Sequence, residues 1–156
     1  MATKKYAPFV PITDQALTLL KSISTPKEND IIYDLGCGDG KVLIYLADQF
    51  PQATYIGIEY GVLPYLLAKI KTRKYKNISV RFKNFFKEDL GSADILIVYL
   101  YPRLMDSLLP KLKKELKPGV VLYSLDFAFS KMEPASIEYN KDASAPRGKR
   151  MLVYQF

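Results

Sequence analysis

Apolar residues along the chain follow two alternating patterns: short continuous runs, and longer stretches in which they recur at helical spacing. The runs predict buried strands at residues 31–35, 53–58, 78–82, 94–99 and 119–125. The stretches between them predict helices over residues 41–50, 63–75 and 101–116. Strands that alternate with helices form a parallel sheet covered by helices on both faces. We therefore expect a doubly wound, Rossmann-like α/β fold.

The two ends of the chain depart from this alternation. Thr13 can cap a helix over residues 14–23, ahead of the first strand. Residues 135–139 and 151–156 are typical of two strands joined by a polar, basic loop. We expect them to form an antiparallel hairpin at one edge of a mostly parallel, seven-stranded sheet. No repeat or linker interrupts residues 1–156, so one domain accounts for the chain.

Composition narrows the class of protein. With 49% hydrophobic and 25% charged residues, the 156-residue chain is globular rather than disordered. Its one cysteine excludes an internal disulfide and fits a reducing compartment. No signal-peptide pattern opens the chain, and the longest apolar run, residues 95–101, is too short to cross a bilayer. We expect a soluble cytoplasmic protein, and a monomer.

The formal net charge of +7 gathers in three basic clusters, at residues 69–76, 111–117 and 147–150. One interpretation is solvated helix faces and loops. The other is attraction to an acidic partner, such as a nucleic acid, an anionic membrane or an acidic protein. Charge alone does not choose between them, and the sequence has no zinc-finger, RGG or aromatic RNA-binding signature that would support a nucleic acid.

The strongest candidate for chemistry is the turn after the first predicted strand. Gly36, Gly38 and Gly40 lie between a strand and a helix, where glycine permits a tight turn and a close approach of the backbone to a ligand. Glu59 ends the second strand about twenty residues later, where a carboxylate can accept ribose hydroxyls. The spacing G-x-G-x-G, rather than G-x-G-x-x-G, favours S-adenosylmethionine over a nicotinamide cofactor.

Side chains around this turn extend the predicted cofactor site. Asp34 can hold a methionine ammonium through water or fix the turn, and Asp39 can sit at the start of the following helix. Tyr60, next to Glu59, is a further candidate. Cys37, within the turn, is interpreted as a packing residue, because the chain has no histidine to activate its thiol or to bind a metal. The alternatives are a tight connection without a ligand and a nicotinamide-binding domain.

The motifs resemble a known family. Asp-Leu-Gly-Cys-Gly-Asp-Gly at residues 34–40 looks like the first motif of class I S-adenosylmethionine-dependent methyltransferases. The wider pattern is similar to the small protein-lysine methyltransferases, which include a broad-specificity archaeal enzyme and the enzymes that modify the c-ring protein of ATP synthase and the adenine nucleotide translocase. The segments that carry this likeness, within residues 6–130, are residues 8–11, 57–59, 84–86, 99–102 and 115–119.

The resemblance implies roles for individual residues. The three glycines would approach the methionine part of S-adenosylmethionine, and Glu59 its ribose. Asn84 would contact the adenine amino group, with Phe85 beside the ring; core packing is the alternative for Phe85. Residues 1–28 would comprise a lid segment and a helix. The lid residues would be Phe9, Val10 and Pro11, with a rigid leader to the helix as the alternative.

The methyl acceptor would bind at the carboxyl ends of the strands, as ligands do in such sheets. The candidates are Tyr99, Tyr101, Asp126, Phe127 and Phe129. Tyrosine oxygens can hold an amine whose deprotonation an apolar pocket favours, and Tyr99 would also contact the cofactor. Asp126 is the one acid available as a general base or amine holder. Structural roles, in the core, at a helix start and in hydrogen bonding, are the alternatives for Tyr99, Tyr101 and Asp126.

The resemblance favours a protein substrate with an accessible lysine. A methyltransferase for RNA or a small molecule remains the alternative enzyme, and a binding module that keeps the fold without catalysis is the non-enzyme alternative. Residues 99–102 lack the Asp/Asn-Pro-Pro-Tyr signature of enzymes that methylate amino groups on bases, which disfavours a DNA adenine substrate. The compact length predicts an open site and broad specificity.

Overall fold

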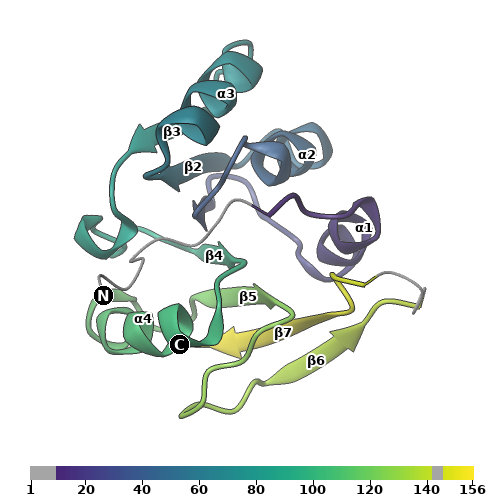
Figure 1. Ribbon diagram of the computed structural model, residues 1–156, viewed down its shortest axis with the longest axis vertical. Coiled ribbons are helices and arrows are strands. Elements are labelled where there is room, and N and C mark those ends of the chain that lie inside the picture. Colours follow the sequence, from purple (N-terminus) through teal and green to yellow (C-terminus); the bar gives the residue numbers. More distant parts are fainter. Residues whose placement is uncertain (1–9, 142–145) are drawn as a thin grey trace, which may run out of the picture.

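The computed structural model describes residues 10–141 and 146–156, and its centre is a seven-stranded sheet in the order β3-β2-β1-β4-β5-β7-β6 (Figure 1). Strands β1 to β5 pair in parallel, whereas β7 is antiparallel to both β5 and β6. The predicted mostly parallel sheet with an antiparallel hairpin at one edge is thus confirmed. The strands are β1 (Ile31–Leu35), β2 (Thr54–Glu59), β3 (Ile78–Phe82), β4 (Ile95–Val98), β5 (Val121–Leu125), β6 (Ser136–Tyr139) and β7 (Arg150–Gln155).

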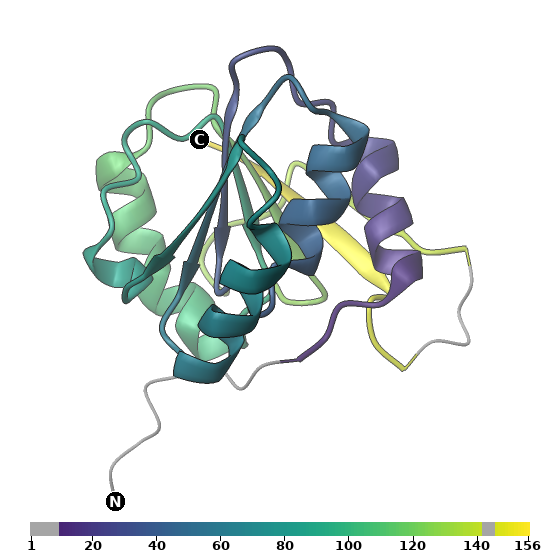
Figure 2. The same cartoon turned by 90° about the horizontal axis from the view of Figure 1, so that it is seen from above.

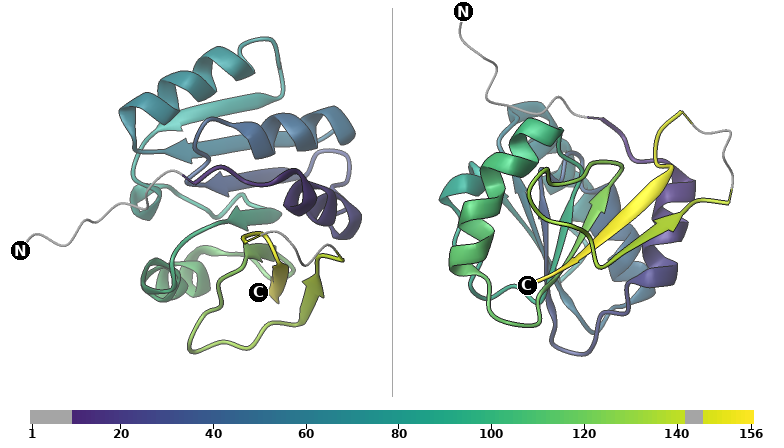
Figure 3. Two further views of the ribbon diagram at one scale, coloured as in Figure 1. Left: turned by 45° about the vertical axis from the view of Figure 1, so that its right-hand side comes forward. Right: turned by 90° about the horizontal axis from the view of Figure 1, so that it is seen from below.

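Helices cover the sheet on both faces (Figures 2 and 3). One face carries α1 (Asp14–Ile23), α2 (Lys41–Gln49) and α3 (Val62–Thr72), and the other carries α4 (Pro102–Glu115). A short 3-10 helix, η1 (Phe85–Lys87), follows β3. The predicted cap of α1 is present, because Thr13 Oγ1 accepts the N–H of Ala16 at 3.2 Å. None of these helices, in the part of the chain that the structure describes, has the length and apolar character needed to span a bilayer.

Two apolar layers hold the helices to the sheet. On one side Leu17 and Leu20 of α1 pack with Leu43 and Leu46 of α2. On the other side the buried residues of α4 pack against the strands; they are Met105, Leu108, Leu109 and Leu112. Every residue of β4 is buried, as its continuous apolar run predicts for a central strand. Each fully buried aliphatic side chain stabilises the fold by roughly 1.5–3 kcal/mol relative to an exposed one.

Helix α3 corrects one expectation. Its apolar pattern predicts a face turned to the core, but the side chains that form the pattern are 39–68% exposed; they are Leu63, Leu66, Leu67 and Ile70. The buried residues of α3 are Ala68 and Thr72. These small side chains let the helix lie close to the glycine turn, where a Cβ at Gly40 would be 3.2 Å from Thr72 Cγ2. The apolar side therefore faces outward at the edge of the sheet.

Candidate active site

The glycine turn after β1 adopts backbone conformations that L side chains rarely take. Gly36, Gly38 and Gly40 have φ of +84°, +57° and +82°. The N–H groups of Gly36 and Cys37 both donate to the carbonyl oxygen of Ile58, at 2.8 and 3.1 Å. The turn is thereby bonded to the end of β2, and helix α2 begins directly after it. The predicted strand–turn–helix geometry is confirmed.

The carboxylate of Glu59 lies against this turn. Its Oε2 accepts the N–H of Gly38 at 2.9 Å, and its Oε1 accepts those of Tyr60 at 2.9 Å and Gly61 at 2.6 Å. A carboxylate offers about four acceptor sites. Three are used by the protein backbone, so Glu59 organises the turn and retains acceptor capacity on Oε2 for a ligand.

Asp34 supplies a buried charge without a partner. Its side chain is 4% exposed, and its Oδ2 has no hydrogen-bond partner among the described residues. Burial, together with the nearby carboxylates of Glu59 and Asp39, raises the pKa of Asp34 to about 8. A buried carboxylate in this state is suited to bind a cationic or hydrogen-donating ligand group, which would restore its ordinary charge.

A cavity of about 370 Å³ opens at this turn. Of the predicted cofactor residues, those that line it are Val10, Pro11, Asp34, Gly36, Cys37, Gly38, Asp39, Glu59, Tyr60, Asn84, Phe85 and Tyr99. Gly40 does not line it, because it sits behind the turn as the N-cap of α2. Phe9 lies outside the described residues. The site expected from scattered motifs is therefore one concave surface.

Two lysines hold the rim of the cavity together. Lys41 Nζ donates to the carbonyl oxygen of Ile12 at 3.1 Å and pairs with Asp14 at 2.8 Å, which ties the segment before α1 to the start of α2. Lys71, from α3, forms an ion pair with Asp39 of the turn. Sequence reasoning missed Lys41, although its place directly after the third glycine was a usable signal.

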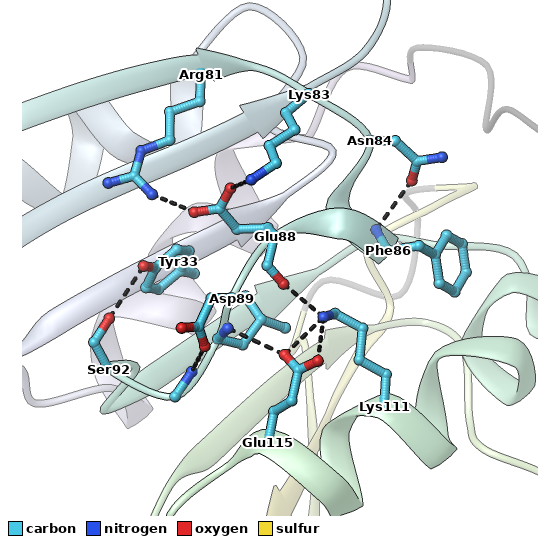
Figure 4. A network of polar contacts seen from close by, with 12 residues as sticks. Tyr33, Arg81, Lys83, Asn84, Phe86, Glu88, Asp89, Ser92, Lys111 and Glu115 are labelled. Atoms are coloured by element: carbon cyan, nitrogen blue, oxygen red, sulfur yellow. Dashed lines mark hydrogen bonds and ion pairs between the residues drawn. The ribbon is translucent and has the colours of Figure 1, made fainter.

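The segment after β3 closes another side of the cavity. Asn84 Oδ1 accepts the N–H of Phe86 at 3.0 Å and so caps η1, as Figure 4 shows. Phe85 and Phe86 line the cavity and also pack against the α4 side of the core, with ring centroids 4.8 Å apart. The alternatives of cofactor contact and core packing are therefore compatible for Phe85.

A polar network fixes this segment from below (Figure 4). The buried carboxylate of Glu88 pairs with Arg81, and with Lys83 at 2.9 Å. Lys111 Nζ donates to the carbonyl oxygen of Glu88 at 2.5 Å and pairs with Glu115 at 2.6 Å. Because β3, η1 and α4 all contribute, residues 84–86 are held in place without occupying a regular strand.

A second cavity, of about 720 Å³, adjoins the first. Both are lined by Val10 and Tyr99. The ring of Phe127 lies 6.0 Å from that of Tyr99, nearly parallel to it, and 5.6 Å from that of Tyr101. The other residues lining this cavity are Asp126, Tyr139, Asn140, Pro146, Arg147, Lys149 and Arg150.

The structure separates the predicted acceptor residues. Tyr99, Tyr101, Asp126 and Phe127 meet in the second cavity, whereas Phe129 is buried in the core with its ring edge-on to Tyr154. The expectation for Phe129 is therefore wrong. Burial, followed by the charge of Asp126, raises the pKa of Tyr99, so its hydroxyl stays protonated at neutral pH.

Asp126 has a structural function that its sequence position did not reveal. Its Oδ2 accepts the N–H of Gly148 at 2.7 Å, and its Oδ1 accepts those of Lys149 at 2.8 Å and Arg150 at 3.3 Å. The guanidinium of Arg150 donates to its carbonyl oxygen. Asp126, at φ +64°, thus holds the loop that enters β7 over the second cavity.

That loop brings three cations to the cavity that sequence reasoning did not assign to the site. Arg147, Lys149 and Arg150 were recognised as a basic cluster, but their distance along the chain from Tyr99 concealed the contact. The hairpin also contributes Tyr139, which is largely exposed. The second cavity is therefore aromatic at its base and positively charged at its rim.

Cys37 is confirmed as a packing residue. Its side chain is buried, and burial strongly raises the pKa of its thiol, which disfavours the nucleophilic thiolate. A Cβ on Gly57 of β2 would lie 2.6 Å from Cys37 Sγ and from Leu43 Cδ1, so only glycine fits there without rearrangement. Among residues 10–141 and 146–156 there is no group of three or more His, Cys, Asp or Glu that could hold a metal.

Comparison with known proteins gives consistent relationships. A family model described as the ANTKMT methyltransferase domain matches residues 34–136. A protein-lysine N-methyltransferase from Saccharolobus islandicus is 31% identical over 88% of this chain and 87% of its own length. A lysine N-methyltransferase from Caenorhabditis elegans, named for its action on the c-ring protein of ATP synthase, is 29% identical over 85% of this chain and 73% of its own length.

Solved structures share the fold. An RNA methyltransferase from Salinibacter ruber, in complex with S-adenosyl-L-homocysteine, superposes with a TM-score of 0.84 at 24% identity, over 94% of this chain and 93% of that one. At this identity the likeness concerns the fold alone. The Rossmann-like methyltransferase fold expected from the first turn is thereby confirmed.

Proposed function

We propose that this chain, which belongs to the family of ANTKMT methyltransferase domains, transfers a methyl group from S-adenosylmethionine to the side-chain amine of protein lysines. One observation carries the proposal: two adjoining cavities share Val10 and Tyr99, one bordered by a buried, unpartnered carboxylate and the other by aromatic rings. A donor in the first cavity would face an acceptor in the second.

The residues of the first cavity fit this cofactor. The unpartnered Oδ2 of Asp34 suits the ammonium of its methionine part, directly or through water. The remaining acceptor capacity of Glu59 suits a ribose hydroxyl, and Asn84 with Phe85 suits the adenine. S-adenosylmethionine supplies a methyl carbon that is already electrophilic, because it is bonded to a sulfonium.

Residues of the second cavity prepare the acceptor amine. A lysine ammonium must lose its proton before attack, and its pKa falls in an apolar pocket near other cations. The rings of Tyr99, Tyr101 and Phe127 provide the apolar part, and the cations of the hairpin loop provide the charge. The proton leaves to solvent through the open rim.

Tyrosine oxygens then orient the neutral amine. We assign Tyr99 and Tyr101 as the residues that hold it, since they flank the junction of the cavities and the start of α4. The amine nitrogen forms a bond to the methyl carbon as the carbon–sulfur bond breaks, and the sulfonium becomes a neutral thioether. Alignment of the nucleophile supplies most of the rate enhancement in such a displacement.

In this mechanism Asp126 is a positioning residue. Its carboxylate oxygens accept three backbone N–H groups of the hairpin loop. It therefore acts through Arg147 and Lys149 rather than by removing a proton from the amine. The Asp126→Asn variant should move the KM for a protein substrate more than kcat.

The test uses S-adenosylmethionine labelled in its methyl group. The purified protein is incubated with a cell extract, and aliquots are then treated with protease or nuclease. We expect the label to stay in the macromolecular fraction after nuclease, to be lost after protease, and to be recovered as methylated lysine after hydrolysis. Label released by nuclease and resistant to protease would instead establish an RNA methyltransferase.

A further inference from the structure

An exposed apolar face runs along α3, away from both cavities. It consists of Val62, Leu63, Leu66, Leu67 and Ile70, and we call it the α3 face. We propose that the α3 face binds the surface of an anionic lipid bilayer, with the helix lying in the plane of the interface. This inference is independent of the proposed methyl acceptor.

The first argument is the arrangement of the apolar side chains. At about 100° per residue, the α3 face occupies an arc of about 140° around the helix, and Lys69 and Lys71 project just beyond its two edges. Its members are 39–68% exposed. Such a surface is the form of an interfacial amphipathic helix, whose lysines reach the lipid headgroups while its apolar side chains enter the acyl boundary.

Aromatic rings widen the same surface. Tyr60 and Phe82 are stacked with centroids 5.7 Å apart, and both rings are nearly half exposed. Tyr65 contacts Phe82 at 5.1 Å and joins this pair to the helix. Contiguous exposed apolar surface of this kind marks an interaction site. Tyrosine is also enriched where one end of a side chain is apolar and the other is hydrated, as at a membrane interface.

Charge selects the partner. Residues 60–87 contain eight cations and no acid. Three of the eight pair with acids of neighbouring elements: Lys71 with Asp39, and Arg81 and Lys83 with Glu88. The other five surround the α3 face in sequence and are exposed; they are Lys69, Arg73, Lys74, Lys76 and Lys87. A partner must therefore be apolar within and anionic at its surface.

An anionic bilayer meets both requirements, and the other candidates fail one of them. A second copy of the chain would bring the same cations against each other across a symmetric interface. A nucleic acid would satisfy the cations but would leave the aliphatic side chains of the α3 face in water. Acidic lipid headgroups over an acyl layer complement the cations and the apolar arc at once.

Docking in this way would set the position of the cofactor cavity. Tyr60, which extends the α3 face, also lines that cavity, and Gly61 links the two along the chain. The mouth of the site would then stand beside the headgroup layer. Acceptors held at a membrane surface would be favoured over those in bulk solution.

The experiment is co-sedimentation of the intact protein with vesicles. One set contains equal parts of phosphatidylcholine and phosphatidylglycerol, and the other contains phosphatidylcholine alone. We expect binding to the anionic set that weakens with salt, and little binding to the neutral set. The double variant Leu63→Gln/Ile70→Gln should lose binding at least about tenfold, as expected for two apolar side chains removed from the membrane. The variant Lys74→Gln/Lys76→Gln should lose about fivefold for each cation.

Matched controls lie on the opposite side of the molecule. Lys21→Gln/Lys27→Gln removes the same charge from α1 and the loop after it, and Tyr139→Gln removes an exposed ring from β6; both should bind as the parent does. Thermal unfolding of each variant shows that it is folded. Equal binding by the α3 variant and the parent, or none to anionic vesicles, would overturn the proposal. A concentration-dependent dimer in lipid-free solution that the α3 variant abolishes would assign the face to a second copy instead.

Discussion

The N–H of Gly38 donates to Oε2 of Glu59 over 2.9 Å, so the acid at the end of β2 holds the turn that follows β1. Two motifs that look separate along the chain therefore act as one unit. Because the same carboxylate also accepts the N–H groups of Tyr60 and Gly61, its removal changes the site both directly and through the backbone.

Replacing Glu59 tests this double role. Glu59→Ala should weaken binding of S-adenosylhomocysteine by about 1–3 kcal/mol, the range for leaving buried polar partners unpaired. It should also lower the melting temperature in the absence of ligand, because three backbone donors lose their acceptor. Titration calorimetry and thermal unfolding measure the two effects. An unchanged affinity would refute the ribose contact, and an unchanged melting temperature would refute the structural one.

Asp34 predicts how stability depends on pH. Its pKa is raised from 3.8 to about 8 in the folded protein, so between these values the folded state binds more protons than the unfolded state. The contribution of Asp34 to stability is therefore complete below about pH 4 and is lost as the pH rises through about 8. Asp34→Asn should remove this part of the pH dependence in denaturant titrations. A variant with the same pH profile as the parent would contradict the assignment.

The same group predicts the opposite trend for ligand binding. The ammonium of S-adenosylhomocysteine requires the ionised carboxylate, so its affinity should increase as the pH rises from 6 towards the pKa of Asp34, at about 8. Asp34→Asn should bind more weakly, and without this increase. Calorimetry in buffers of different ionisation enthalpy also counts the proton that Asp34 releases on binding. Affinity that stays level across this range in the parent would exclude a direct charge contact.

Tyr99 and Tyr101 should affect the acceptor rather than the cofactor. Removing one hydroxyl in Tyr99→Phe or Tyr101→Phe should lower kcat/KM for a protein substrate about three- to tenfold, the value of one hydrogen bond. Binding of S-adenosylhomocysteine should change little for Tyr101→Phe, since Tyr101 lines the second cavity and not the first. Tyr45→Phe on α2 is the matched control. Full activity in both site variants would show that the hydroxyls do not hold the amine.

Gly57 tests the packing beneath the turn. A methyl group there would lie 2.6 Å from Cys37 Sγ and Leu43 Cδ1, so Gly57→Ala should destabilise the protein by about 1–3 kcal/mol. Chemical denaturation measures the change, with Gly91→Ala, in an exposed turn, as the control. The double variant Gly57→Ala/Leu43→Ala makes room for the methyl group, so its two effects should not be additive.

The cofactor site was predictable because its determinants are local. The glycines, Asp34 and Glu59 stand at strand ends, and the strand ends of a parallel sheet meet at one edge. The direction of α3 was not predictable from its pattern. Apolar spacing identifies one side of a helix, but whether that side or the small side chains of Ala68 and Thr72 face the sheet depends on the neighbouring surface.

The rim of the second cavity escaped prediction for a different reason. Arg147 and Lys149 reach the site through hydrogen bonds between Asp126 and the loop before β7. These contacts join residues more than twenty positions apart, and no periodicity signals them. A side chain that looked like a candidate base thus proved to be the anchor of a loop.

Because Val10 and Tyr99 stand between the two cavities, the chain assigns them to different stretches of sequence. Donor contacts concentrate in residues 34–86, and acceptor contacts in residues 99–150. Grafting residues 126–150 of a relative onto this scaffold would thus exchange the target while leaving the turn and Glu59 as they are. New specificities are open to such a fold through recombination of whole segments, with Tyr99 as the junction that every chimaera must preserve.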